Sequence, residues 1–445
     1  MSAQLETSAV GRPVRTKRFR YANKDVERLT HYLFRYPAKF HPPIVRALIE
    51  EYSSPGQCIL DPFCGSGSLL VEARAAARHS IGSDIDPIAV FASKIKTYRY
   101  DPNKLKASCE RLRLKLQILE RTQDEYTYRQ FTDLASWRLN DTLLTENLWV
   151  PEIPNILHWF RRYVVLDLAR IHGEIMKITV PTSHRHFFLL CFASIIRAAS
   201  NADPVPVSGL EVTSHMRRKD EQGRLINPFA LFNRAMEKAL RAVTEFRQRI
   251  DPATRVSVFQ ANALSLNGKL RSEVQTIITS PPYHNAVDYY RRHKLEMFWL
   301  GFTKTQAERL AILPQYIGRP CAGSSTAALM LDASRAGLAL TWEKKIRRSS
   351  PKRANAFRQY IASMLKVIDE FARILAKNNH AIFVVGHSSW RGKELPTADL
   401  FADLARAKFD LIERCWYPVV NRYMSYSRHN GANINKEYIV VFRRR

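Results

Sequence analysis

The residues with the clearest chemical potential form a short loop, Asp61-Pro62-Phe63-Cys64-Gly65-Ser66-Gly67. An apolar run at 58–60 precedes it and a segment rich in Ala and Leu, 68–78, follows, which predicts a strand before the loop and a helix after it. Glycines at 65 and 67 would let the backbone approach a ligand at the helix N-terminus. No Gly-Lys-Ser/Thr sequence follows, so the loop does not match an ATP-hydrolysing phosphate loop.

An acidic side chain follows the next predicted strand. This strand, 80–83, ends at Asp84-Ile85-Asp86, and another helix is predicted over 88–96. In mononucleotide-binding βαβ units, an acid at the end of this strand accepts hydrogen bonds from a ribose diol. Asp84 is the candidate for that role, and the sequence leaves the nearby Asp86 open as an alternative.

A second reactive loop, Ser280-Pro281-Pro282-Tyr283, follows the apolar run 274–279. Two consecutive prolines fix an extended backbone that donates no N–H groups. The loop would therefore present a hydroxyl at Ser280, a carbonyl at Pro281 and an aromatic face at Tyr283. Because open α/β sheets bind ligands at the carboxyl ends of their strands, this position indicates a ligand site.

The elements predicted around these loops alternate between strands and helices. A helix with one apolar face is predicted within 32–52, where Pro42 and Pro43 suit a first turn. Further strands are predicted over the ranges 256–259, 381–385, 409–415 and 438–442. This alternation indicates an α/β fold.

The α/β pattern is interrupted, which divides the chain into parts. Residues 29–100, 251–300 and 356–445 are predicted to form a catalytic domain. Residues 101–250 are predicted to be a large helical insertion, with helices over 103–121, 155–176, 184–200 and 228–250. Residues 1–28 form a basic arm, predicted to be mobile or to contact nucleic acid, and 301–355 form a less regular basic segment.

The composition indicates a polyanionic partner. The chain has 445 residues, with 69 Lys and Arg against 41 Asp and Glu, and a formal net charge of +28. Such a charge favours phosphate contacts, which release counterions and drive binding. A membrane surface is disfavoured because no long basic amphipathic helix is evident and the longest apolar run, near 187–196, is too short to cross a bilayer.

The Cys and His residues do not follow the spacing of a metal site. The six cysteines include no CxxC pair, and the thirteen histidines are scattered, with no Cys or acid partners at ligand spacing for His184/His186 or His380/His387. These patterns argue against a structural zinc site and against a disulfide framework, and they favour a reducing compartment. No metal is therefore expected.

The two loops, taken in this order, resemble the motifs of the DNA amino-methyltransferases, which methylate an exocyclic amine with S-adenosylmethionine. Tyr36-Pro37-Ala38-Lys39-Phe40 resembles the family's N-terminal motif, which closes over the methionine end of the cofactor. Ala261-Asn262-Ala263 lies where an adenine-contacting loop follows the third strand, with Asn in place of the commoner Asp. Segments 288–291 and 421–424 also look like members of the family, whereas the insertion does not.

The resemblance implies a fold, a cofactor and a set of site residues. The fold is a Rossmann-like methyltransferase fold with a mixed, mostly parallel seven-stranded sheet and a large helical insertion. The cofactor is S-adenosyl-L-methionine and the substrate is double-stranded DNA. Cofactor binding is assigned to Lys39, Phe40, Asp61, Phe63, Gly65, Gly67, Asp84 and Asn262, and catalysis to Ser280, Pro281, Pro282 and Tyr283.

The implied chemistry requires positioning and no covalent enzyme intermediate. The lone pair of an exocyclic amine is delocalised into the ring, and accepting the amine protons at Ser280 and at the Pro281 carbonyl would localise it. Tyr283 would stack on a base that has left the duplex. Serine at 280, rather than Asp or Asn, resembles the cytosine-N4 branch, so cytosine N4 is the predicted target and adenine N6 the alternative.

Two other functions remain open at this point. An RNA amino-methyltransferase shares similar motifs, but such enzymes usually carry Asn or Asp at the position of Ser280 and an added N-terminal RNA-binding module. About 30 residues precede the first motif here, which is too few for that module. The third hypothesis is a catalytically inactive nucleic-acid-binding module. The intact glycine loop and the intact Ser280–Tyr283 loop argue against it.

Two basic clusters outside the catalytic pattern are candidate DNA contacts. Arg217, Arg218 and Lys219 lie on a predicted loop of the insertion, and Lys344, Lys345, Arg347 and Arg348 lie in the segment 301–355. Phosphate contacts carry no sequence information, so we expect the insertion to read bases and 344–353 to hold the backbone. Stand-alone modification and a restriction–modification system both fit, which makes a cognate restriction endonuclease a candidate partner and a prokaryotic, nucleoid-associated cytoplasmic location the expectation.

Overall fold

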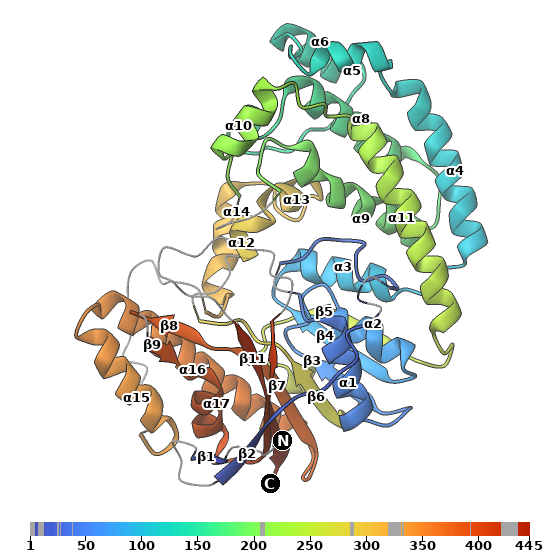
Figure 1. Cartoon of the computed structure of the whole chain (residues 1–445). Coiled ribbons are helices and arrows are strands. Elements are labelled where there is room, and N and C mark those ends of the chain that lie inside the picture. Colours follow the sequence, from blue (N-terminus) through green and yellow to red (C-terminus); the bar gives the residue numbers. More distant parts are fainter. Residues whose placement is uncertain are drawn as a thin grey trace.

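The computed structural model describes all residues except 1–4, 8–12, 25, 27, 38, 205–209, 285–288, 319–330, 332, 392 and 420–434. Segments 288–291 and 421–424, which the sequence singled out, therefore lie partly or wholly outside the described residues. A twisted sheet with helices on both faces forms one part of the molecule, and a group of helices forms the other (Figure 1).

The central sheet has nine strands in the order β1-β2-β10-β11-β7-β6-β3-β4-β5. Strands β3 to β7 pair in parallel, and β11 runs antiparallel to both β7 and β10. The strands are β1 (Leu5–Thr7), β2 (Pro13–Arg18), β3 (Cys58–Asp61), β4 (His79–Asp84), β5 (Val256–Gln260), β6 (Thr276–Thr279), β7 (His380–Gly386), β10 (Phe409–Pro418) and β11 (Lys436–Arg444). This topology confirms the Rossmann-like methyltransferase fold, with nine strands instead of the seven expected.

The two additional strands come from the basic N-terminal segment. Strand β2 pairs in parallel with β10 through Thr16, Lys17 and Arg18, and β1 pairs antiparallel with β2. Pro13–Arg18 therefore forms a strand of the sheet, where the sequence predicted a mobile arm or a nucleic-acid contact over 1–28. Its exposed basic residues hid the strand, because an edge strand keeps much of its surface in water and shows little apolar pattern.

The sheet is buried on both faces because its strands alternate their side chains between two cores. Ile59 on β3 joins the core beneath α1 (Pro42–Tyr52) and α2 (Ser68–Ala75). Leu60, the next residue, joins the opposite core beneath α16 (Pro351–Ile374) and α17 (Thr397–Ala405). The helix expected within 32–52 is α1. It begins at Pro42, ten residues after the start of that range.

The chain order of the strands creates a ligand crevice. From β3 the chain moves outward to β4 and β5, with α3 (Pro87–Thr97) after β4, and then returns to the other side of β3 with β6 and β7. The carboxyl ends of β3 and β6 therefore flank a topological switch point, where open α/β sheets bind ligands. Both loops that the sequence singled out lie at this point.

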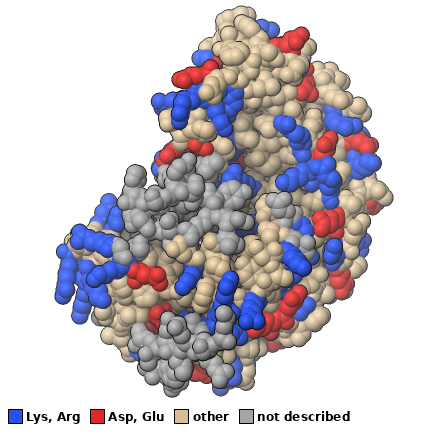
Figure 2. Space-filling view, in the orientation of Figure 1, with Lys and Arg blue, Asp and Glu red and all other residues tan. Residues whose placement is uncertain are grey.

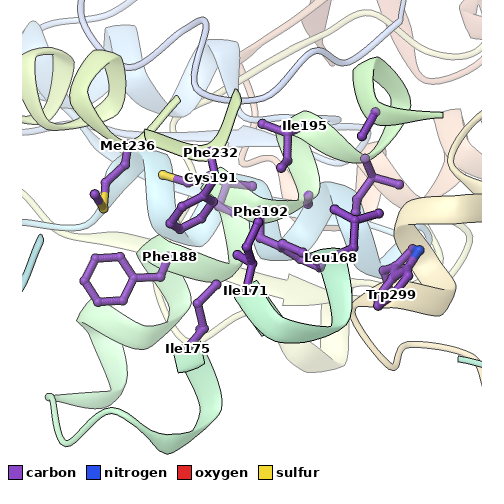
Figure 3. Packing of buried hydrophobic residues seen from close by; sticks show 14 of the residues in the cluster. Leu168, Ile171, Ile175, Phe188, Cys191, Phe192, Ile195, Phe232, Met236 and Trp299 are labelled. Carbon is purple, nitrogen blue, oxygen red and sulfur yellow. The ribbon is translucent and has the colours of Figure 1, made fainter. Parts of the chain in front are cut away.

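The expected insertion is helical throughout its regular structure. Its helices are α4 (Pro102–Leu119), α5 (Gln123–Arg129), α6 (Ser136–Thr145), α7 (Ile156–Trp159), α8 (Arg162–Lys177), α9 (Thr182–Ala199), α10 (Ser214–Glu221) and α11 (Pro228–Arg249). Helix α9 is apolar on most sides and lies at the centre, with Phe188 and Phe192 packed among α8 and α11 side chains (Figure 3). This core also takes in Trp299 from α13 (Lys294–Trp299) and Ile88 from α3, so the insertion packs firmly on the catalytic sheet's helices.

Two local expectations about the basic clusters were wrong. Arg217, Arg218 and Lys219 lie on helix α10 and not on a loop. The described part of the segment 301–355 is largely helical, with α14 (Gln306–Ile312), a 3₁₀ turn η2 (Leu313–Gln315), α15 (Ala333–Arg347) and the first turn of α16. Both α10 and the end of α15 carry dense charge and few apolar residues, which weakens the helical pattern that a sequence shows.

The remaining regular elements are short. They are α12 (Tyr289–Arg292), the 3₁₀ turn η1 (Asn267–Lys269) and the hairpin of β8 (Ser388–Trp390) and β9 (Lys393–Leu395). Among the described residues, no helix combines the length and the apolar character needed to cross a bilayer.

Candidate active site

A pocket opens at the carboxyl ends of β3, β4 and β6 and collects most of the predicted site residues. Of these, Lys39, Phe40, Asp61, Phe63, Gly65, Asp84, Asn262, Ser280 and Pro282 line it. Gly67, Pro281 and Tyr283 adjoin lining residues but are not part of the wall. Sequence motifs separated by more than 200 positions therefore share one pocket.

Some lining residues were not in the predicted set. Tyr36 belongs to the N-terminal motif, and Gln315, Tyr316 and Ile317 come from the stretch after α14. No sequence pattern indicates the second group, because a turn that covers a pocket needs no apolar period. Tyr36 could have been chosen from its motif, since aromatic side chains commonly line ligand pockets.

The glycine loop is shaped by contacts that exclude side chains. Gly65 and Gly67 have φ values of +48° and +77°, a left-handed conformation that favours glycine. A Cβ on Gly65 would lie 3.1 Å from the Tyr36 ring, and one on Gly67 would lie 2.8 Å from Ser93 Oγ. Glycine at both positions therefore lets the loop follow this path, close to Tyr36 and α3, without strain.

We expect Gly67→Val to distort the loop. A β-branched residue at this φ carries backbone strain of about 1–3 kcal/mol, in addition to the contact with Ser93. Thermal unfolding should show the loss of stability, and calorimetry should show weaker ligand binding. Gly268→Val is a matched control, because a Cβ there meets no atom within 4 Å. Wild-type stability and binding in Gly67→Val would contradict this account of the loop.

The Asp84 carboxyl is held beside the glycine loop by two backbone hydrogen bonds and can still accept hydrogen bonds from a ligand. Its Oδ2 accepts a hydrogen bond from Gly65 N at 2.9 Å, and its Oδ1 accepts one from Asp86 N at 3.0 Å. Burial, and then the nearby Asp86 charge, raise the pKa of Asp84 to about 7, against the lowering effect of these backbone donors. Each carboxylate oxygen has a second lone pair, so the group can still accept hydrogen bonds from a ligand.

Asp86, the alternative acid, is the N-cap residue of helix α3. Its side chain accepts a hydrogen bond from Ile88 N at 3.0 Å and caps helix α3. Its other oxygen lies 3.6 Å from Nδ1 of the buried His293. Asp86 does not line the pocket, so the geometry favours Asp84 as the acid that faces a ligand.

Asp61 joins the two reactive loops. Its Oδ1 accepts hydrogen bonds from Thr279 Oγ1 at 2.7 Å and from Phe63 N at 3.2 Å. Burial raises the pKa of Asp61 to about 7, against the lowering effect of these two donors. Because Thr279 immediately precedes Ser280, this contact sets the second loop against the first.

The N-terminal motif is attached through Lys39 to a buried polar cluster. The buried His31 ring lies 2.8 Å from Glu72 Oε1, and Arg46 Nε donates to Glu72 Oε2 at 3.1 Å. Burial lowers the pKa of His31 to about 3, and the His31 and Arg46 contacts hold the pKa of Glu72 at about 2 although burial opposes them. Lys39 Nζ donates to the His31 carbonyl at 2.9 Å, which fixes Lys39 at the pocket wall.

The second loop is held through its tyrosine. Tyr283 OH donates to Glu437 Oε1 at 2.8 Å and lies 3.5 Å from Ser280 Oγ. Tyr417 OH donates to the other oxygen, Glu437 Oε2. Glu437 is the second residue of β11 and was not predicted as a site residue, because only the sheet order brings it beside the loop.

The two basic clusters are exposed and lie outside the pocket. Lys344, Lys345 and Arg348 are exposed near the end of α15, and Arg347 pairs with Glu343 at 2.7 Å. Arg217, Arg218 and Lys219 are exposed on α10. Figure 2 shows basic side chains over both regions on the same face of the molecule.

The described residues hold no group of three or more His, Cys, Asp or Glu side chains that could share a metal ion.

Comparison with known proteins gives one family match and several relatives. Residues 12–94 match the family model N6_N4_Mtase, described as DNA methylase. The chain is 23% identical to the type II methyltransferase M.MvaI of Kocuria varians over 403 residues, which cover 86% of this chain and 82% of the relative. It is 26% identical to the type II methyltransferase M.BsoBI of Geobacillus stearothermophilus over 298 residues, which cover 63% of this chain and 54% of the relative. The crystal structure of TrmN from Thermus thermophilus aligns with a TM-score of 0.32 and 8% identity, covering 92% of this chain and 50% of that chain.

Proposed function

We propose that this chain transfers a methyl group from S-adenosylmethionine to the exocyclic N4 amine of a cytosine that has left double-stranded DNA. The match over 12–94 and the two relatives support an amino-methyltransferase of the N6/N4 DNA methylase family, and S-adenosylmethionine is its cofactor. The observation that carries the proposal is the pocket, where the glycine loop, Asp84 and Ser280 meet.

The pocket residues fit S-adenosylmethionine. The cofactor supplies a methyl group on a positively charged sulfur, which makes that methyl an activated donor. Asp84 offers acceptor oxygens suited to a ribose diol, and the backbone at Gly65 leaves space that a side chain would fill. In the proposal, Asn262 faces the adenine end, and Lys39, Phe40, Asp61 and Phe63 line the remainder of the site.

The Ser280 loop acts on the target amine. Ser280 Oγ and the Pro281 carbonyl accept hydrogen bonds from the two amine protons, which localises the nitrogen lone pair toward the methyl donor. Tyr283 supplies an aromatic face for the base, and its hydroxyl contact with Glu437 fixes the ring. Extrusion of the base costs a few kcal/mol, which stacking and edge contacts offset.

Methyl transfer to DNA tests this function directly. The protein is incubated with duplex DNA and labelled cofactor, and the digested nucleosides are separated by mass spectrometry. N4-methylcytosine is the expected product. If N6-methyladenine is found instead, the target base is adenine, the alternative. Transfer to total RNA but not to DNA would overturn the proposal. Long-read methylation analysis of DNA from expressing cells would give the target sequence.

The target site and the biological setting follow from the same experiment. A methylated site that a neighbouring endonuclease cleaves when unmodified would identify a restriction–modification pair, with that endonuclease as the partner. We propose this setting, in a prokaryotic cell and on nucleoid DNA, on the basis of the two type II relatives.

Cofactor affinity should rise with pH. The pKa of Asp84 is raised to about 7, so this carboxyl is protonated below that value and accepts both ribose hydrogens best when ionised. Affinity is therefore expected to increase about tenfold from about pH 6 to about pH 8, as the ionised fraction grows. Calorimetric titration across this range measures it.

Asp84→Asn is the matched variant for this test. It keeps the shape of the side chain but cannot ionise, so binding should be weak and nearly independent of pH. Asp84→Ala should weaken binding further, because all acceptor oxygens are lost. A wild-type affinity that does not change with pH, together with normal binding by Asp84→Asn, would remove Asp84 from the cofactor site.

A further inference from the structure

A continuous chain of hydroxyl and carboxyl groups leads from the pocket to Glu437, near the start of strand β11. It runs from Ser280 Oγ to Tyr283 OH, 3.5 Å away, and from Tyr283 OH to Glu437 Oε1 at 2.8 Å. Tyr417 OH donates to the second oxygen of Glu437. Ser280 lines the pocket and Glu437 does not, so the chain connects the site of reaction to a partly buried acid.

Methylation of a neutral amine produces a proton that must leave the site. The amine nitrogen uses its lone pair to form the nitrogen–methyl bond, and the electron pair of the broken methyl–sulfur bond stays on sulfur. The nitrogen then carries a positive charge until one of its hydrogens departs. Serine is a poor base, so the hydroxyl of Ser280 can pass this proton on but cannot keep it.

We propose that Glu437 accepts the proton released by the reaction, through a relay of the hydroxyls of Ser280 and Tyr283. The proton leaves nitrogen for Ser280 Oγ, the Ser280 hydrogen moves to the Tyr283 oxygen, and the Tyr283 hydrogen moves to Glu437 Oε1. The amine is left neutral and methylated, and the carboxylate becomes a carboxylic acid that later returns its proton to solvent. This inference rests on the proposed function and adds a residue to it.

The surroundings of Glu437 suit a proton acceptor. Burial raises the pKa of Glu437 above its ordinary value, and the hydrogen bonds from Tyr417 and Tyr283 oppose that rise only in part. Burial raises the pKa of the Tyr21 phenol, in the segment after β2; Arg18 lowers that pKa, and the nearby Glu437 charge adds to the rise. Register places Gly386 of β7 opposite Glu437, and the next residue, His387, stacks on Tyr438 at 4.0 Å.

Two variants separate a relay from a purely structural role. Glu437→Gln keeps an acceptor for the Tyr283 hydroxyl but cannot take up a proton. Tyr283→Phe keeps the aromatic face for stacking but removes the hydroxyl that passes the proton on. Each should lower kcat about 100-fold, the lower end of the range for proton-transfer catalysis, with cofactor affinity and the KM for DNA within about twofold of wild type.

The combined variant and the pH profile sharpen the test. Because both changes interrupt one path, Tyr283→Phe/Glu437→Gln should lose little more than either single variant. In wild type, kcat should rise with pH through the raised pKa of Glu437, because only the carboxylate accepts a proton. That rise should be absent in Glu437→Gln.

The chain offers a matched pair of controls away from the pocket. Tyr52 OH, at the end of α1, donates to Glu413 Oε2 on the neighbouring strand β10 at 2.9 Å, so this tyrosine and glutamate are paired in the same way. Glu413→Gln and Tyr52→Phe remove the same groups and should leave kcat unchanged.

A measurement without turnover gives a second test. Carbon-13 NMR of labelled glutamate in the ligand-free protein should show a carboxyl that titrates above the ordinary range and is absent in Glu437→Gln. Tyr283→Phe should move its midpoint upward, because a donor to the carboxylate is lost. A Glu437 carboxyl that titrates normally would overturn the relay.

The failure of the relay differs from the failure of the proposed function. If wild-type protein methylates DNA but Glu437→Gln and Tyr283→Phe keep full kcat and the wild-type pH profile, the relay is wrong and the function stands. If wild-type protein transfers no methyl group to DNA, the function itself is wrong. If Glu437→Gln does not fold, as thermal unfolding would reveal, Tyr283→Phe decides alone.

Discussion

Replacing Ser280 by alanine should leave S-adenosylmethionine binding intact while turnover falls by about 100- to 1,000-fold. The hydroxyl is proposed to hold the amine in its reactive geometry, and loss of one such preorganised contact typically has an effect of about this size. Single-turnover methyl transfer measures the chemical step, and calorimetry measures cofactor affinity. Ser280 follows β6 and Asp84 ends β4, on opposite sides of β3, so the two properties should separate.

The control for this change is Ser363→Ala on helix α16. Its hydroxyl donates to the Gln359 carbonyl within the same helix and lies outside the pocket. Tyr283→Ala should also reduce turnover, because it removes stacking worth about 1–3 kcal/mol together with the hydroxyl. Full turnover in Ser280→Ala would show that this loop is not the active site.

Much of this site could be predicted because its residues follow buried strands. The runs 58–60 and 274–279 are apolar enough to predict strands, and parallel strands bring their carboxyl ends to one edge of a sheet. The structure places Asp61 and Ser280 at the ends of the adjacent strands β3 and β6, as that rule requires.

Other features depend on contacts that a linear pattern does not carry. Glu437 reaches Tyr283 only because β11 returns antiparallel beside β7, and nothing in its own sequence neighbourhood indicates that meeting. Ile317 reaches the pocket from a turn without apolar period. The choice of Asp84 over Asp86 likewise needed the structure, because only the cap on α3 shows how Asp86 is used.

The edges of the fold were predicted least well. Strand β2 and helix α10 are rich in Arg and Lys, so the charge that suggested a nucleic-acid partner also hid their regular structure. Elements that stay in water need no apolar stripe, and their order comes from pairing and capping. The surfaces proposed to contact DNA are therefore the parts for which the sequence is least informative about shape.

The exposed cluster at the end of α15 should contribute affinity for DNA without sequence preference. Arg347 binds Glu343 and Asn355, so replacing it would disturb the helix, and the test variant is Lys344→Ala/Lys345→Ala/Arg348→Ala. Each phosphate contact that is lost should reduce the slope of log affinity against log salt by about 0.9, giving a total reduction of about 2–3. Fluorescence anisotropy with specific and unrelated duplexes over a range of salt concentrations measures this slope.

The matched control removes the same charge from another surface. Lys104, Lys106 and Arg113 are exposed on α4, which lies across the molecule from α15 (Figure 1). Their replacement by alanine should leave the salt slope within error of wild type. An equal loss in both triple variants would mean that net charge, and not the α15 cluster, sets the affinity.

Substitution of Arg217, Arg218 and Lys219 should have a different outcome, namely altered choice of the methylated sequence. These side chains extend from α10, a short helix on the same face as α15, and Arg and Lys are the side chains that commonly read guanine in the major groove. Each base contact is worth about 1–3 kcal/mol of discrimination, so loss of one should relax one position of the site by about tenfold or more. Long-read methylation profiles of the α10 and α15 variants compare them directly. A changed site preference in the α15 variant, with only weaker binding in the α10 variant, would exchange the two roles.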